Sequence, residues 1–104
     1  MLPKNRITPH PGRVLQEDFL EPLEISQLRF SKLLGIPFQR VNEIVNGKRG
    51  ISSDTAWLFS QAFGTTPEFW MNLQTMHDLT KNRPTHTVKR IVSGRTKPEL
   101  ASTR

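Results

Sequence analysis

The sequence predicts an all-α domain of five short helices between residues 10 and 80, followed by a basic tail. Apolar side chains recur at helical spacing through this stretch, and glycine or proline interrupts the pattern at short intervals. A chain of 104 residues has the length of one domain.

The composition excludes several classes of protein. The chain has no cysteine, which excludes disulfides and thiolate zinc sites. No apolar run approaches the roughly 20 residues that cross a bilayer. Residues 1–10 lack the apolar stretch of a signal peptide. We therefore expect a cytoplasmic protein without a membrane partner.

The first helix is expected to begin at Pro11 and Gly12. Residues 1–9 contain two prolines and no apolar period, so we expect them to form a loose N-terminal arm. The apolar positions of the helix are Val14, Leu15, Phe19 and Leu20. Pro22 is expected to end it, because a helix rarely runs through a proline.

The next two helices are short and close together in the sequence. Ser26 is a good N-cap and Gly35 a natural C′ residue for the second helix. Pro37 suits the first turn of the third helix, which Gly47 ends. Two short helices with so few residues between them must meet at a steep angle, which is typical of a helix-turn-helix.

Two further helices are predicted before the tail. Ser52 or Ser53 is expected to cap the fourth, with Asp54 placed favourably against its dipole. Thr66 and Pro67 begin the fifth. The inner apolar positions are Thr55, Leu58, Phe59, Ala62 and Phe63 in the fourth helix and Phe69, Trp70, Leu73, Met76 and Leu79 in the fifth.

The excess positive charge lies in the tail. The formal net charge is +6, yet residues 1–80 hold eight basic and eight acidic side chains, whereas residues 81–104 hold seven basic and one acidic. Residues 85–93 alternate in polarity, which predicts a short strand, and residues 94–104 are expected to be disordered. The tail as a whole, residues 81–104, is expected to be partly disordered or associated with the dimer. A basic tail can be merely solvated, so evidence for nucleic-acid binding must come from the helices.

The stretch from Gln27 to Gly47 fits a DNA-binding helix-turn-helix at several positions. The small residue Ser31 stands where the two helices cross, and Gly35 stands where the turn needs a positive φ. Val41 and Ile44 can bury the back of the second helix of the motif. A helical bundle with no role in nucleic-acid binding is the alternative interpretation.

The solvent side of that helix is predicted to read DNA bases. Glutamine and asparagine can bond adenine, arginine can bond guanine, glutamate can accept from cytosine, and phenylalanine can contact a thymine methyl group. The candidate base readers are Phe38, Gln39, Arg40, Asn42 and Glu43. Gln39 and Arg40 are the strongest, whereas Glu43 could equally orient Arg40. Each could instead belong to an ordinary exposed helix face.

Other residues are candidates for phosphate contact and for dimerisation. Gln27, Asn46, Lys48 and Arg49 flank the motif and are expected to contact DNA phosphates, although Lys48 and Arg49 could be a solvated turn. Such proteins usually dimerise on palindromic sites. The candidate dimer surface is Phe69, Trp70, Leu73 and Met76, which could alternatively cover the core.

Four stretches of the sequence resemble the HigA family of antitoxins: His10–Gly12, Phe19–Leu23, Asn42–Ile51 and Gly64–Gln74. The resemblance implies a five-helix, lambda-repressor-like domain of the Xre type. It also implies a homodimer that represses its own operon by binding operator DNA, which would associate it with the nucleoid. A further implied partner is a HigB toxin, similar to RelE-type ribosome-dependent mRNA endonucleases, which the antitoxin neutralises.

Two other classes of function can be compared with this one. A stand-alone Xre-type or phage-like regulator would have no toxin partner, and a short adjacent gene for a basic, RelE-like protein would argue against it. An enzyme is not expected, because the sequence contains no G-x-S-x-G, P-loop or paired-carboxylate pattern. His10, His77 and His86 are too far apart in the sequence to suggest a metal cluster, so no metal or cofactor is expected.

Overall fold

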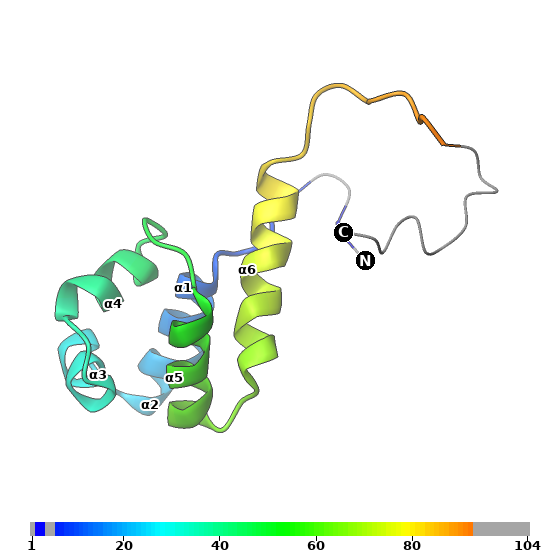
Figure 1. The fold of residues 1–104 in the computed structure, drawn as a ribbon. Coiled ribbons are helices and arrows are strands. Elements are labelled where there is room, and N and C mark those ends of the chain that lie inside the picture. Colours follow the sequence, from blue (N-terminus) through cyan, green and yellow to red (C-terminus); the bar gives the residue numbers. More distant parts are fainter. Residues whose placement is uncertain (1, 4–5, 93–104) are drawn as a thin grey trace.

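The computed structural model describes residues 2–3 and 6–92, which form five helical segments and no strand (Figure 1). The elements are α1 (Pro11–Val14), the π-helical turn η1 (Leu15–Leu20), α2 (Glu21–Leu23), α3 (Gln27–Leu34), α4 (Phe38–Val45), α5 (Ser53–Phe63) and α6 (Pro67–Lys81). The first three follow one another without a break and make one helical segment. The predicted all-α domain of five helices is confirmed.

Pro22 does not end the first helix, contrary to the prediction. The helix continues through it to Leu23, after which Glu24 adopts a left-handed conformation with φ 56°. Just before the proline the helix widens into η1, and the Glu21 N–H donates to the Gln16 carbonyl five residues back. A wider turn shifts the hydrogen-bond register, which accommodates a ring that has no N–H to donate.

The other helix boundaries follow the predicted caps closely. The side chains of Ser26 and Thr66 accept hydrogen bonds from backbone N–H groups in the first turns of α3 and α6. Two predictions were inexact. Pro37 is the N-cap of α4 rather than part of its first turn. Ser52 stands at the N-cap of α5, but its hydroxyl donates to the Asp54 carboxylate instead of capping the backbone.

The core lies where the five segments meet, and aromatic rings fill its centre. The buried hydrophobic residues are Leu15, Leu20, Phe30, Val41, Ile44, Ile51, Ala56, Phe59 and Trp70. The Trp70 ring packs against Phe19, Phe59, Phe63 and Phe69. Its indole N–H donates to the Thr65 hydroxyl at 2.8 Å, so the polar edge of the ring is satisfied.

The backbones of α1 and α4 touch at Gly12. Pro11 and Gly12 are buried, and a Cβ atom placed on Gly12 would overlap the carbonyl group of Ile44. The His10 ring caps this end of α1, because its Nδ1 accepts the Gly12 N–H at 2.9 Å. This junction holds the C-terminal end of α4 against the first helical segment.

The expected loose arm is tied down at Thr8. The Thr8 N–H donates to the Thr80 hydroxyl at 3.0 Å, and His77 Nδ1 lies 2.7 Å from the Thr8 carbonyl oxygen. These hydrogen bonds hold residue 8 against the C-terminal half of α6, where the side chain of Thr80 is buried.

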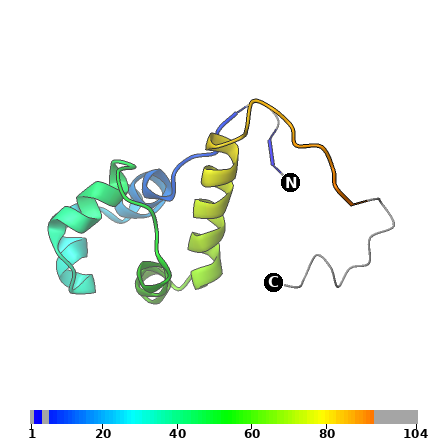
Figure 2. The same cartoon turned by 45° about the horizontal axis from the view of Figure 1, so that its top comes forward.

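Beyond α6 the chain leaves the helical body, as both views show (Figure 1 and Figure 2). Residues 82–92 are exposed, and residues 85–92 form no strand, so the predicted strand over 85–93 is wrong in its described part. An alternating pattern needs a partner strand, and the described residues supply none. Position 93 and the expected disorder of residues 94–104 lie outside the described residues.

Acidification is expected to lower the free energy of unfolding through His10. Burial and the adjacent His77 lower the pKa of His10 from 6.5, while Asp78 opposes this shift and Lys81 adds to it. The folded protein therefore binds fewer protons than the unfolded chain. His10 contributes stability that is fully present above pH 6.5 and is lost as the pH falls from 6.5 through the lowered pKa of the folded protein, because a protonated Nδ1 cannot accept the Gly12 N–H.

Urea unfolding followed by circular dichroism between about pH 8 and pH 5 measures this dependence. The variant His10→Asn keeps an N-cap acceptor that does not titrate, so its stability should vary less over the same range. An equal slope in both proteins would contradict the assignment.

Candidate nucleic-acid interface

The turn between α3 and α4 has the geometry that the sequence predicted. Gly35 adopts φ +73°, and its N–H donates to the Ser31 carbonyl at 2.9 Å. Ser31 is buried, and its hydroxyl donates to the Leu28 carbonyl within α3. A small side chain at this position lets α4 cross α3 closely, which makes the pair a helix-turn-helix.

Helix α4 has a buried side and a polar side. Val41 and Ile44 are completely buried, while Gln39 and Asn46 are exposed and Phe38 is 45% exposed. The remaining candidate base readers, Arg40, Asn42 and Glu43, are half-buried. The polar side of α4 therefore lies at the protein surface and not in the core.

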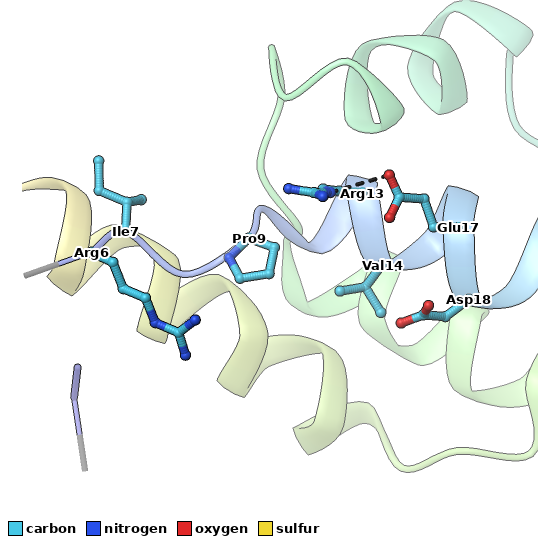
Figure 3. A pocket seen from close by; sticks show the side chains of 7 residues that line it. All are labelled: Arg6, Ile7, Pro9, Arg13, Val14, Glu17 and Asp18. Atoms are coloured by element: carbon cyan, nitrogen blue, oxygen red, sulfur yellow. Dashed lines mark hydrogen bonds and ion pairs between the residues drawn. The ribbon is translucent and has the colours of Figure 1, made fainter.

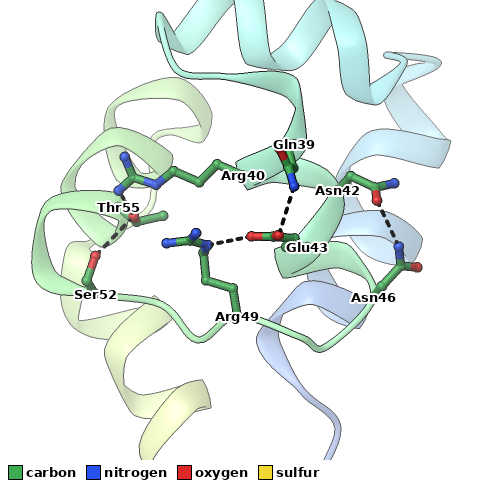
Figure 4. A network of polar contacts seen from close by, with 8 residues as sticks. All are labelled: Gln39, Arg40, Asn42, Glu43, Asn46, Arg49, Ser52 and Thr55. Atoms are coloured by element: carbon green, nitrogen blue, oxygen red, sulfur yellow. Dashed lines mark hydrogen bonds and ion pairs between the residues drawn. The ribbon is translucent and has the colours of Figure 1, made fainter.

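Glu43 joins two of the other candidates (Figure 4). Its carboxylate accepts from Arg49 Nε at 3.0 Å and from Gln39 Nε2 at 3.4 Å. Gln39 and Arg49 are exposed, and an ion pair whose cation is exposed to solvent contributes little to stability. The three side chains are therefore close together and can exchange these hydrogen bonds for contacts to a ligand.

A second chain of polar contacts joins α4 to the start of α3. Asn46 Nδ2 donates to Asn42 Oδ1 at 3.2 Å, and Asn42 Nδ2 donates to Gln27 Oε1 at 3.0 Å. Gln27 stands in the first turn of α3. The structure thus brings together two residues predicted to contact phosphate and one predicted to read a base.

Arg40 is engaged within the protein. Its Nη2 donates to Asp54 Oδ2 at 2.9 Å and to Thr55 Oγ1 at 2.5 Å, both at the start of α5. Its Nε is buried without a hydrogen-bond partner. Hydrogen bonds from Ser52 and Arg40 lower the pKa of Asp54 to about 2. Asp54 stands in the first turn of α5, as the sequence predicts, and its contact with Arg40 is an additional role that the local sequence does not indicate.

The turn after α4 is cationic and exposed, as expected for Lys48 and Arg49. Lys48 borders a polar hollow together with His10, His77 and Lys81. The two histidine rings meet edge to face with centroids 5.0 Å apart, a proximity that sequence spacing did not suggest. Among residues 2–3 and 6–92, no group of three or more histidine, aspartate and glutamate side chains could hold a metal ion.

The proposed dimer surface on α6 is only partly available. Trp70 is completely buried inside the monomer, which supports the alternative that it covers the core. Phe69 is 38% exposed, and Leu73 and Met76 are half-buried. These three residues remain candidates for a dimer contact.

Another hollow lies between the N-terminal segment and the first helix (Figure 3). Its walls are Arg6, Ile7, Pro9, Arg13, Val14, Glu17 and Asp18. Arg13 and Glu17 form an exposed ion pair one helical turn apart, with Nε and Oε2 separated by 3.1 Å. Such a pair is an ordinary feature of a solvated helix face.

No helix in the described part of the chain is long and apolar enough to cross a membrane.

Comparison with known proteins places this motif in a family. A helix-turn-helix family model matches residues 17–70. Virulence-associated protein I of Dichelobacter nodosus is 41% identical over 70 residues, which cover 67% of this chain and 65% of that protein. The chain therefore spans slightly less than two thirds of the length of that relative.

Two further relatives are antitoxins. Antitoxin HigA-1 of Vibrio cholerae is 35% identical over 74 residues, which cover 69% of this chain and 70% of that protein. The structure of Pseudomonas aeruginosa antitoxin HigA with the higBA promoter has a TM-score of 0.70 at 38% identity, over 71% of this chain and 80% of that one. The chain belongs to the helix-turn-helix family and, within it, to the group of HigA-type antitoxins.

Proposed function

We propose that the protein is a sequence-specific DNA-binding repressor of its own operon. The observation that carries this proposal is the polar surface of α4, which lies opposite the buried Val41 and Ile44 and is continuous with the first turn of α3. A helix of this size fits the major groove, where the base edges are distinguishable. The relative solved with promoter DNA supports the same role.

Base reading is assigned to the polar side of α4. Phe38 and Gln39 lie at its N-terminal end, which is the part of a recognition helix that usually contacts bases. Glu43 and Asn42 follow one turn later on the same side. The bond of Glu43 to Gln39 is long at 3.4 Å, so Gln39 loses little by turning to an adenine edge.

Phosphate contacts are assigned to the borders of the motif. Gln27 begins α3, so its side chain and the neighbouring backbone N–H groups can face one phosphate. Asn46, Lys48 and Arg49 can approach the backbone from the other end of α4. Each lysine or arginine engaged adds to the salt dependence of binding.

Gln39→Ala is expected to weaken operator binding by about 1–3 kcal/mol and to relax the preference at one base pair. The reason is the loss of one two-point contact to a base edge. Fluorescence anisotropy with DNA footprinted in the promoter of its own operon measures the change. Gln61→Ala, at an exposed glutamine of α5, is the matched control and should bind as the wild type does. Unchanged affinity of Gln39→Ala, with intact circular dichroism, would remove Gln39 from the set of base readers.

A homodimer is proposed as the DNA-binding form, because one helix-turn-helix reads only a half-site. Phe69, Leu73 and Met76 supply the contact surface on α6. Sedimentation equilibrium of the free protein tests this point, and a monomer at all concentrations would count against it.

We further propose that the protein neutralises a HigB-like, mRNA-cleaving toxin in the cytoplasm, at the nucleoid. The HigA relatives support this part. The alternative is a stand-alone Xre-type or phage-like regulator. Co-expression with the product of the adjacent gene distinguishes them, since an antitoxin should co-purify with that product and relieve its toxicity.

A further inference from the structure

We propose that Arg40 positions the recognition helix α4 on α5 through Asp54 and Thr55, and that it does not read a base. The inference rests on the proposed DNA-binding function and refines it. It reverses the role that the sequence alone gave to this arginine.

The hydrogen-bond geometry leaves Arg40 few donors for DNA. A guanidinium bonds guanine through two neighbouring N–H groups, either along its end or along its side. The end face consists of Nη1 and Nη2, and the side face consists of Nε and Nη2. Nη2 already donates to Asp54 at 2.9 Å and to Thr55 at 2.5 Å, and Nε is buried. Neither two-point face is therefore free.

The Asp54 carboxylate is what makes this position favourable for the Arg40 guanidinium. Arg40 stands near the start of α4, and its guanidinium lies against the start of α5. Both helix ends carry partial positive charge, which disfavours a cation. The Asp54 carboxylate offsets it, and this carboxylate is also held by the Ser52 hydroxyl. The low pKa of Asp54, about 2, keeps its carboxyl group ionised at neutral pH.

Exposure separates Arg40 from a base-reading side chain. The Arg40 side chain is 24% exposed, whereas that of its partner Asp54 is 69% exposed. The Arg40 guanidinium is thus more deeply buried than the Asp54 carboxylate and lies between α4 and α5. Leaving this position to reach a base would unpair both groups. The interaction therefore sets the angle at which α4 meets DNA, and through that angle it supports every base contact alike.

The test compares Arg40→Ala, Asp54→Ala and the double variant in the full-length chain. Each is titrated against the footprinted operator and a panel of its single base-pair substitutions. If Arg40 is a positioning residue, both single variants should lose at least about fivefold in affinity, equally across the panel, and the double variant should lose no more than either. Asp54→Glu, which keeps the carboxylate, should retain most of the affinity. Glu17→Ala, which removes an exposed acid from a different ion pair, is the matched control and should have no effect.

Three outcomes would overturn the inference. The first is a loss of preference at one base pair in Arg40→Ala that Asp54→Ala does not share, since this is the signature of a base reader. The second is wild-type affinity in both single variants. The third concerns the free protein: urea unfolding of the same variants must show coupling between positions 40 and 54, and independent effects would refute the contact. If the wild type binds no operator, the proposed function fails, and the unfolding cycle still decides whether the contact joins α4 to α5.

Discussion

Gly12→Ala is expected to destabilise the fold by about 3 kcal/mol or more, because the structure has no space for the new methyl group. It would overlap the carbonyl of Ile44 and press on the Cα atom of Val45, both of which are backbone atoms of α4. A backbone cannot rotate away as a side chain can, so α1 and α4 would have to separate. Urea unfolding followed by circular dichroism measures the loss.

Gly64→Ala is the matched control for this substitution. Gly64 ends α5 with φ +73°, and nothing lies within 4 Å of the position its Cβ would take. It therefore loses only the left-handed preference of glycine, about 1–2 kcal/mol. Equal losses in the two variants would mean that the α1–α4 contact is looser than the structure indicates.

Trp70→Ala is expected to cost about 3–5 kcal/mol, which is a large part of the 5–15 kcal/mol that usually stabilises a domain. Trp70 is completely buried, and its removal would leave Phe59 and Phe63 facing a cavity. The Thr65 hydroxyl would also lose its indole donor. Thermal unfolding should show a midpoint temperature that is much lower than that of the wild type.

Trp57→Ala provides the comparison, since Trp57 is 57% exposed on α5. A surface substitution of this kind usually changes stability by no more than about 0.5 kcal/mol. If both tryptophan variants melted alike, Trp70 would not be the centre of the core. Stable, folded Trp70→Ala with altered self-association would instead favour the dimer role that the sequence suggested.

The sequence predicts the helices well because their signals are local. Ser26, Gly35 and Thr66 act through hydrogen bonds and backbone angles within one turn of their own positions, so their roles can be read from nearby residues alone. The prediction that Pro22 ends the first helix was wrong because the effect of this proline depends on the hydrogen-bond register of η1. No single residue type indicates that register.

The interface was predicted only in part, because several roles depend on contacts between distant residues. The polar side of α4 follows from the helical period, and Gln39 lies where that period places it. Arg40 shares the period but meets Asp54 and Thr55, fourteen and fifteen residues later, across a helix junction. The contact between His10 and His77 arises in the same way, from the packing of α1 beside α6.

The π-helical turn η1 makes the length of the first helix as important as its composition. A π-helical turn holds one residue more than the same stretch of α-helix, because its N–H groups donate five residues back instead of four. Removing one residue from η1 is therefore expected to convert it to an ordinary α-helix, with Gly12 still facing Ile44. Inserting one residue would instead turn the N-terminal end of the helix by about 100°, and a bulkier residue would meet α4 in place of Gly12. The number of residues in this segment, and not only its chemistry, therefore governs how α4 is positioned.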